Sequence, residues 1–438
     1  MSGYKRYPAY RESGVEWIGE IPEGWSCRPL KFSLRLHTEK AGDSCTGEFR
    51  LGLENVESWT GSYIKTDSEF EGDGISFETG DLLFGKLRPY LAKVLEAPRS
   101  GTAVGEFFVL KPANGVSSRF MFYRLLSKPV IDVLDGSTYG AKMPRTSWDD
   151  MGGLKLPIPS TSEQDQIAAF LDRKTAQIDR LIEIKGRQIE LLKEERTAVI
   201  NHAVTKGLNP EAKMKESGIE WIGEIPEGWQ VKRVKFLAKD GSGIQMGPFG
   251  SMLSKLPNGP TGYKLYGQEN TISGNFSSGN RWLEPSRFSE LEKYIMEEGD
   301  IVLTRKGSIG NCRLVPEGIM PGVIDSDTIR VRVNDNLISS HFFVLLLHDA
   351  WYLQSQILCN CRGAILSGLN TSTISELFIM CPPRAEQTEI EAFLRNELLK
   401  IANLENTAKK TIQFLQEYRA TLISDAVTGK IDVREEAA

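Results

Sequence analysis

An internal repeat constrains the possible folds of this sequence more than any other feature. Residues 12–25 read ESGVEWIGEIPEGW and residues 216–229 read ESGIEWIGEIPEGW, so thirteen of fourteen positions are identical. A second pair of similar segments, LLKEERTAVINHAVTKG at 191–207 and FLQEYRATLISDAVTGK at 414–430, aligns at a different offset. The chain therefore consists of a motif, a variable region and a helical segment, and this order occurs twice.

The segments that follow the variable regions have the hydrophobic spacing of coiled-coil helices. Alternating steps of four and three residues from Leu171 and from Leu394 reach mostly apolar residues over about five heptads. Each segment begins after prolines, and Gly207 and Gly429 lie where a helix would end. The spacing predicts two helices of about 38 residues, roughly 57 Å long.

Arg196 and Arg419 occupy the same position in the two helical segments, on the otherwise apolar seam. Two interpretations are open. Each arginine can bury its aliphatic stem on a hydrated seam and keep its charge in water. Alternatively, the two arginines set the register of an antiparallel coiled coil within the chain.

The two variable regions, 26–157 and 230–380, have the pattern of mixed α+β domains. Short alternating runs such as 80–87 and 299–310 are broken by Gly, Asn, Ser and Pro, which is typical of strands and turns. Apolar stretches at 118–129 and 340–353 favour helices. Because the frame is repeated and the regions between differ, we expect two different recognition surfaces.

Composition narrows the function further. The net charge is −5 and no segment is strongly basic, which argues against a nonspecific nucleic-acid binder. No apolar run approaches the roughly 18 residues of a membrane span, and no secretory signal is recognisable at the start. The six cysteines form no CxxC pair, so we expect a reduced, cytoplasmic protein without disulfides or a zinc site.

Motifs for catalysis are missing. The sequence has no HExxH, no GxxxxGK[ST] loop and no GxSxG, and its four histidines form no ligand pair. The Cys359–Cys361 pair supplies too few ligands for a metal. We therefore expect a protein that is not an enzyme and that holds no metal or cofactor.

The duplicated arrangement resembles the specificity subunit of type I restriction-modification enzymes. The resemblance covers almost the whole chain and includes WIGEIPEGW before each variable region and the segments LPIPSTSEQDQIAAFLD and CPPRAEQTEIEAFL at the helix starts. It implies an α+β fold in which two mixed α/β target-recognition domains are joined by two long antiparallel coiled-coil helices, with pseudo-twofold symmetry. The corresponding segments are a first recognition domain at 1–158, a central spacer helix at 159–207, a second recognition domain at 208–381 and a C-terminal spacer helix at 382–438.

The resemblance also implies the activity and the partners. Each recognition domain would read one half of a bipartite, asymmetric sequence in double-stranded DNA. Two methyltransferase subunits, which use S-adenosylmethionine, would methylate adenine, and motor-nuclease subunits, which use ATP and magnesium, would cleave DNA. The alternative is a coiled-coil adaptor that binds proteins through its two modules and does not bind DNA.

Reading base edges requires arginine, lysine and amide side chains, and glycines allow a close approach of the backbone to DNA. In the first variable region the alternative is that Leu87, Tyr90 and Leu91 belong to the core while the charges are only solvated. In the first variable region the candidate DNA-binding residues are Lys86, Arg88, Tyr90, Lys93, Tyr139, Lys142 and Arg145. In the second they are Gln245, Ser251, Lys264, Tyr266, Gln268, Asn270, Arg305, Lys306 and Asn370.

The tryptophans of the repeated motif, Trp17, Trp25, Trp221 and Trp229, are candidates for stacking on bases. They are identical in the two halves, however, whereas the recognised half-sites should differ. We therefore expect them to pack each recognition domain against the helical frame.

Overall fold

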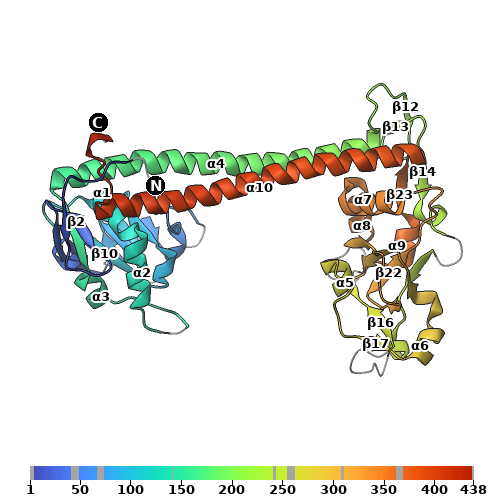
Figure 1. Ribbon diagram of the computed structural model, residues 1–438, viewed down its shortest axis with the longest axis horizontal. Helices are drawn as coiled ribbons and strands as arrows, with labels where there is room; N and C mark the ends of the chain where they lie inside the picture. The colour runs from blue at the N-terminus through green and yellow to red at the C-terminus, as the bar shows by residue number, and fades with distance from the viewer. Residues whose placement is uncertain are drawn as a thin grey trace. The chain divides into compact units, whose positions relative to one another are not determined.

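The computed structural model describes residues 4–40, 49–66, 74–140, 142–239, 243–253, 262–306, 310–361 and 368–436. The chain forms two compact units (Figure 1). Unit 1 comprises Met1–Arg187 and Ala408–Ala438, and unit 2 comprises Gln188–Thr407. Each unit contains one variable region and about half of each long helix. The division into four segments stays a prediction.

The two long helices are α4 (Thr161–Lys206) and α10 (Arg384–Thr428). With 46 and 45 residues they exceed the predicted length, because they begin at Thr161 and Arg384, before the seam positions Leu171 and Leu394 from which the spacing was counted. The Ser160 hydroxyl accepts a hydrogen bond from the Glu163 amide (3.4 Å) and caps the start of α4. Gly207 and Gly429, both at φ +75°, follow the last helical residues as predicted.

The seam found in the sequence is the buried face of both helices. Steps of four and three residues reach ten positions in each helix, from Leu171 to Ala203 in α4 and from Leu394 to Ala426 in α10. None of these residues is exposed. In unit 1, Ile178 of α4 shares a core with Leu422 of α10. In unit 2, Ile200 of α4 shares a core with Ile390 of α10. The first half of one helix thus packs against the last half of the other, and the predicted antiparallel packing is confirmed.

Unit 1 contains two main sheets. Their strand orders are β4-β10-β7-β8 and β5-β9-β6, and β5 is parallel to β9. Two small sheets pair β1 with β2 and β3 with β11. The strands are β1 (Tyr10–Glu12), β2 (Glu20–Pro22), β3 (Ser26–Pro29), β4 (Leu34–His37), β5 (Phe49–Leu51), β6 (Ile75–Phe77), β7 (Leu82–Gly85), β8 (Val94–Glu96), β9 (Gly101–Ala103), β10 (Phe107–Pro112) and β11 (Lys155–Ile158). The short helices are η1 (Leu30–Phe32), η2 (Leu53–Asn55), η3 (Pro89–Leu91), α1 (Ser118–Leu126), α2 (Lys128–Gly136), α3 (Trp148–Gly153) and η7 (Arg434–Glu436).

Unit 2 repeats this topology. Its main sheets have the orders β15-β22-β19-β20 and β17-β16-β21-β18, and β16 is parallel to β21. The strands are β12 (Met214–Glu216), β13 (Glu224–Pro226), β14 (Gln230–Arg233), β15 (Ile244–Met246), β16 (Tyr263–Tyr266), β17 (Trp282–Leu283), β18 (Ile295–Met296), β19 (Ile301–Thr304), β20 (Cys312–Leu314), β21 (Gly322–Ile324), β22 (Thr328–Val331) and β23 (Phe378–Cys381). The short helices are η4 (Val234–Phe236), η5 (Gly250–Leu253), α5 (Gln268–Ser273), α6 (Pro285–Glu290), η6 (Glu292–Tyr294), α7 (Ser340–Asp349), α8 (Trp351–Cys361) and α9 (Thr371–Glu376).

The common topology shows that the two variable regions share one fold although they share little sequence. The predicted strand segments contain β7 and β19, and the predicted helical segments contain α1 and α7. Unit 2 carries an additional edge strand, β17, which pairs antiparallel with β16.

The repeated tryptophans hold the ends of both long helices. Trp25 is buried in unit 1, and its indole N–H donates to the Glu163 carboxylate in the first turn of α4 (3.1 Å). Gly429, which follows α10, is so close that an added Cβ would lie 3.3 Å from the Trp25 ring. In unit 2, Trp229 donates in the same way to Glu386 at the start of α10 (2.9 Å). The predicted packing role is thus confirmed for these two tryptophans.

Trp17 and Trp221 are less deeply buried than Trp25 and Trp229. Trp17 is half-buried and packs against the core of unit 1. Trp221 is exposed and lies against the Tyr352 ring, with 6.5 Å between ring centroids. None of the helices in the described part of the chain is long and apolar enough to cross a membrane.

Candidate nucleic-acid interface

In unit 1 the loop after β7 and the segment before α3 lie side by side, and together they carry most of the predicted DNA-binding residues. Tyr139 and Arg145 exchange both backbone hydrogen bonds (3.1 and 3.0 Å). The amide of Arg88 donates to the Pro144 carbonyl (2.8 Å), and the amide of Thr146 donates to the Lys86 carbonyl (3.1 Å). The structure therefore brings together residues that are 56 and 60 positions apart in the sequence. We call residues 86–91 and 139–146, without Ala141, the first reading surface.

The outermost side chains of the first reading surface are Arg88, Tyr90, Tyr139 and Lys142, all of which are exposed. Tyr139 is 60% exposed although it is aromatic. Sequence reasoning missed the adjacent Met143, which is 50% exposed. A guanidinium, an ammonium and aromatic rings at one surface can bond base edges or phosphates and stack on bases or sugars.

Glu106 holds the two segments of the first reading surface together. Its carboxylate accepts a hydrogen bond from the Arg145 guanidinium (2.7 Å), and its carbonyl accepts one from the Lys86 amide (2.8 Å). The Lys86 ammonium donates to the Gly105 carbonyl (2.6 Å), and burial lowers the pKa of this lysine. Lys86 and Arg145 are thus partly committed to contacts within the unit.

Lys93 is half-buried, and its ammonium is turned toward backbone carbonyls of unit 1. Its ammonium donates to the carbonyls of Leu53 (2.5 Å) and Val56 (3.0 Å), and burial lowers its pKa. The structure therefore gives this side chain a role in holding η2, and its prediction as a DNA contact stays a prediction.

In unit 2 the residue after β19 makes the same backbone hydrogen bonds as the residue after β7 in unit 1, but the side chains differ. The Arg305 amide donates to the Asp327 carbonyl (3.0 Å), as Lys86 does to Glu106 in unit 1. The Leu369 amide donates to the Arg305 carbonyl (2.9 Å), which repeats the bond between Thr146 and Lys86. We call residues 305–306 and 368–370 the second reading surface.

Two cations mark this second surface. Lys306 is exposed and lies 3.0 Å from the Asp327 carboxylate. The Arg305 guanidinium is half-buried, lies 5.2 Å from the centroid of the Phe249 ring, and donates to the Ser326 carbonyl (3.5 Å). Phe249 is 50% exposed and was missed in the sequence. The equivalent positions in the two units therefore present different combinations of charge and aromatic surface.

Three residues predicted to bind DNA are buried structural residues of unit 2. Lys264 donates to the Ser277 carbonyl (2.7 Å), and burial lowers its pKa. Tyr266 donates to the Met320 carbonyl (2.7 Å), and burial raises its pKa to about 12. Asn270 accepts a hydrogen bond from the Gly267 amide (3.0 Å) at the start of α5. With their side chains 1% exposed and hydrogen-bonded, these residues are unavailable to DNA, which corrects the predictions.

A short motif shared by both halves accounts for Asn270. Asn55 accepts a hydrogen bond from the Gly52 amide (2.7 Å), as Asn270 does from Gly267. The pattern Gly-x-Glu-Asn occurs at 52–55 and 267–270, in both cases after a strand that is parallel to its neighbour. Comparison of these segments would have indicated a turn instead of a reading side chain.

The other predicted residues of unit 2 have mixed positions. Gln245 is half-buried and donates to the Met246 carbonyl (2.7 Å). Gln268 is half-buried, and Asn370 is exposed but caps α9 by accepting a bond from the Thr373 amide (2.8 Å). Ser251 lies in η5, and its side chain lies outside the described residues. Among the residues with described placements, no group of three or more His, Cys, Asp or Glu could hold a metal ion.

Comparisons with known proteins agree with this architecture. Residues 251–413 match the family model described as the type I restriction modification DNA specificity domain. A relative from Methanocaldococcus jannaschii, the putative type I restriction enzyme MjaX specificity subunit, is 22% identical, and the match covers 95% of this chain and 96% of the relative.

Two solved structures share the fold. A chain from a structural study of complex assembly and conformational transition of the type I R-M system has a TM-score of 0.71 at 16% identity, covering 93% of this chain and 98% of that one. The HsdS subunit from Thermoanaerobacter tengcongensis has a TM-score of 0.56 at 17% identity, covering 94% and 98%. These structures show the fold, and residues 251–413 resemble the type I restriction modification DNA specificity domain. The resemblance to type I specificity subunits that the repeated motifs indicate is thereby confirmed.

Proposed function

We propose that this chain is the DNA-binding specificity subunit of a type I restriction-modification system and reads a bipartite, asymmetric site. The observation that carries the proposal is the pair of equivalent reading surfaces. Both are built on the same turn. In unit 1 the amide of Lys86, after β7, donates to the carbonyl of Glu106, before β10, and in unit 2 the amide of Arg305, after β19, donates to the carbonyl of Asp327, before β22. One scaffold that displays two sets of polar side chains suits the reading of two different half-sites.

The chemistry of the exposed side chains supports base reading. Arg88 and Lys142 in unit 1 and Lys306 in unit 2 can donate to guanine, and their positive charge favours a position near phosphates. Because the net charge of the chain is −5, tight binding requires partner subunits to supply part of the phosphate contacts.

The proposed partners are two methyltransferase subunits that use S-adenosylmethionine and motor-nuclease subunits that use ATP and magnesium. They would perform adenine methylation and DNA cleavage, and this chain would perform no chemistry itself. Apolar side chains that point away from the helical seam support docking on the long helices. In unit 1 these exposed residues are Leu181, Ile184 and Phe414, and in unit 2 they are Leu191, Leu399 and Leu404.

The proposal can be tested by sequencing methylated DNA from a host that produces this chain with its methyltransferase. We expect a split methylated sequence that disappears when this chain is deleted. Replacing residues 26–157 with the variable region of another specificity subunit should change one half of that sequence and leave the other half unchanged. An active methyltransferase whose methylation pattern does not depend on this chain would refute the proposal and favour the coiled-coil adaptor.

A further inference from the structure

Unit 1 contains a strained backbone path that leads to the first reading surface. In the described part of the chain, the non-glycine residues with positive φ are Trp59 (67°), Arg88 (52°) and Ala92 (46°). The amide of Trp59 donates to the carbonyl of Ala92 (3.3 Å), and the amide of Ala92 donates to the carbonyl of Pro89 (2.8 Å). Arg88 precedes Pro89 in the chain, and its carbonyl accepts a hydrogen bond from the Leu91 amide (2.9 Å), so the three strained residues are connected through η3. Strain of this kind persists only where the surroundings enforce it, and it gathers at functional sites.

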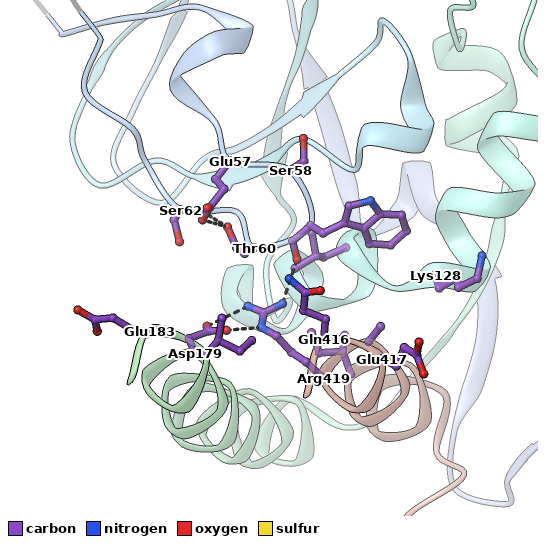
Figure 2. A pocket seen from close by; sticks show the side chains of 15 residues that line it. Glu57, Ser58, Thr60, Ser62, Lys128, Asp179, Glu183, Gln416, Glu417 and Arg419 are labelled. Atoms are coloured by element: carbon purple, nitrogen blue, oxygen red, sulfur yellow. Dashed lines mark hydrogen bonds and ion pairs between the residues drawn. The ribbon is translucent and has the colours of Figure 1, made fainter. Parts of the chain in front are cut away.

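Arg419 of α10 holds the far end of this path. Its guanidinium donates to the Trp59 carbonyl (2.9 Å) and to the Asp179 carboxylate of α4 (2.9 Å). Figure 2 shows Arg419 and Asp179 joined by two dashed lines at the edge of a pocket. The Arg419 side chain is only 9% exposed, whereas that of Asp179 is 43% exposed, so the arginine reaches its partners from a largely buried position. One buried arginine therefore connects both long helices to the loop that carries Trp59.

The loop that carries Trp59 is tightly packed on one side and borders a cavity on the other. Gly61, at φ +72°, is so close to α1 that an added Cβ would lie 2.4 Å from the Phe122 ring. The loop at 57–62 is thus pressed against α1 on one side. On the side of the helices it borders a cavity of about 700 Å³, whose lining includes Glu57, Glu183 and Gln416 (Figure 2). No other guanidinium lines this cavity within the described residues.

We propose that Arg419 is a positioning residue for DNA reading by unit 1. By bonding α4 and the Trp59 carbonyl together, it fixes the strained path through Ala92 that orients Arg88 and Tyr90. The proposal rests on the proposed function in so far as these exposed side chains read DNA. It resolves the role of this seam arginine, which neither keeps its charge in water nor forms a symmetric pair with Arg196.

Unit 2 provides a matched comparison. Arg196 is the repeat equivalent of Arg419, but the position equivalent to Asp179 is Ala402. Arg196 instead contacts Asp349 at the end of α7 (3.1 Å). The R196Q variant therefore removes an equivalent seam arginine without touching the path to Arg88.

The first test is hydrogen–deuterium exchange of the full chain without DNA. In R419Q, peptides that contain Trp59 and Ala92 should lose about tenfold in protection, because a hydrogen bond to a charged group is lost. R196Q should leave these peptides unchanged. D179N, which keeps Arg419 but removes the charge of its partner, should give a smaller loss, and circular dichroism melting should show that each variant is folded. Unchanged exchange in folded R419Q would overturn the proposal.

The second test measures methylation by the assembled complex on DNA with single base changes in either half-site. We expect R419Q to lower discrimination in the half read by unit 1 by about tenfold and to leave the other half unchanged. R419K, which keeps one donor, should restore part of it. Unchanged discrimination in both halves would overturn the positioning role even if exchange rises. If the wild-type chain directs no split methylation, the proposed function fails, and the exchange experiment alone decides whether Arg419 fixes the loop.

Discussion

Arg124 of α1 is fully buried, and replacing it with methionine should stabilise the protein. One guanidinium nitrogen donates to the Val427 carbonyl (2.7 Å) near the end of α10, while Nε and the other nitrogen have no partner among the described residues. Burial lowers the pKa of Arg124 from 12.5 to about 9. In unit 2 the equivalent position of α7 is Leu346, which is also fully buried. An apolar side chain therefore already fits at this place in the fold.

The magnitude follows from the charge. A pKa lowered from 12.5 to about 9 corresponds to roughly 5 kcal/mol of unfavourable free energy for the charged form. Replacing Arg124 would lose the favourable interaction of its charge with the C-terminus of α10, up to about 2 kcal/mol. It would also leave the Val427 carbonyl without a donor, which costs about 1 kcal/mol. We expect R124M to raise the free energy of unfolding by about 2 kcal/mol, which corresponds to a Tm increase of roughly 4–8 °C for a unit of this size.

Thermal and guanidinium unfolding followed by circular dichroism can measure this change. R124A is the matched control and should be about 3 kcal/mol less stable than R124M, because both variants remove the charge but only R124A leaves a cavity. The sign of the pH dependence is a second check. Between pH 9 and 12.5 the unfolded chain binds more protons at this residue, so the stability of the wild type relative to R124M should rise with pH in that window. A lower Tm for R124M than for the wild type would refute the reasoning.

Three further predictions concern the helix ends, the reading surfaces and a histidine. G429A should lower the melting temperature more than G207A does. Both glycines have φ +75°, so the backbone strain of the two variants is the same. A Cβ at 429 would lie 2.5 Å from the Pro22 ring, whereas a Cβ at 207 would lie 2.8 Å from the flexible carboxylate of Glu386. In methylation assays, R88A should relax base preference in one half-site and K306A in the other, by about 1–3 kcal/mol each if they bond bases; effects on both halves from one variant would contradict the division of labour. The hydrogen bond to the neighbouring Asp349 raises the pKa of His348, so the charged histidine stabilises the folded chain below pH 6.5 and this contribution fades as the pH rises. H348N should therefore be less stable than the wild type at low pH, by under about 1 kcal/mol because the side chain is half-exposed, and the difference should shrink at higher pH. Equal losses in melts at pH 5.5 and 8.5 would contradict this.

The frame of the fold could be predicted because it occurs twice in the sequence. The repeated motif and the seam from Leu171 are local patterns, and the burial of Trp25, Trp229 and the seam residues follows from duplication and periodicity. The helix lengths were underestimated because the seam count began at Leu171, ten residues after the helix start at Thr161. Local spacing therefore identified the buried face better than the helix boundaries.

The reading surfaces could be predicted only in part, because burial of a polar side chain depends on contacts that are distant in sequence. Lys264 and Lys306 are chemically identical, but only the fold shows that the first donates to the Ser277 carbonyl and the second faces solvent. The amide-and-glycine pattern around Asn270 serves a turn as well as it would serve base reading. Glu106 was not considered because a carboxylate alone does not suggest DNA binding; its importance comes from its contact with Arg145.

The contacts that join each variable region to the frame explain how one scaffold can carry different recognition sequences. Gln164 of α4 accepts a hydrogen bond from the amide of Ser117 (2.8 Å), and Gln387 of α10 accepts one from the amide of Ser339 (2.9 Å). Both glutamines are buried, and both bond backbone groups at the start of a helix, α1 or α7. Because any non-proline residue supplies that amide, the variable region can change its side chains without losing this attachment. The Arg419 contact to the Trp59 carbonyl follows the same rule, since it also reads backbone and not side chain. Substitution of a whole variable region is therefore compatible with the frame as long as the backbone path is kept, and under the proposed function new side chains on the reading surfaces would change the DNA sequence that is read.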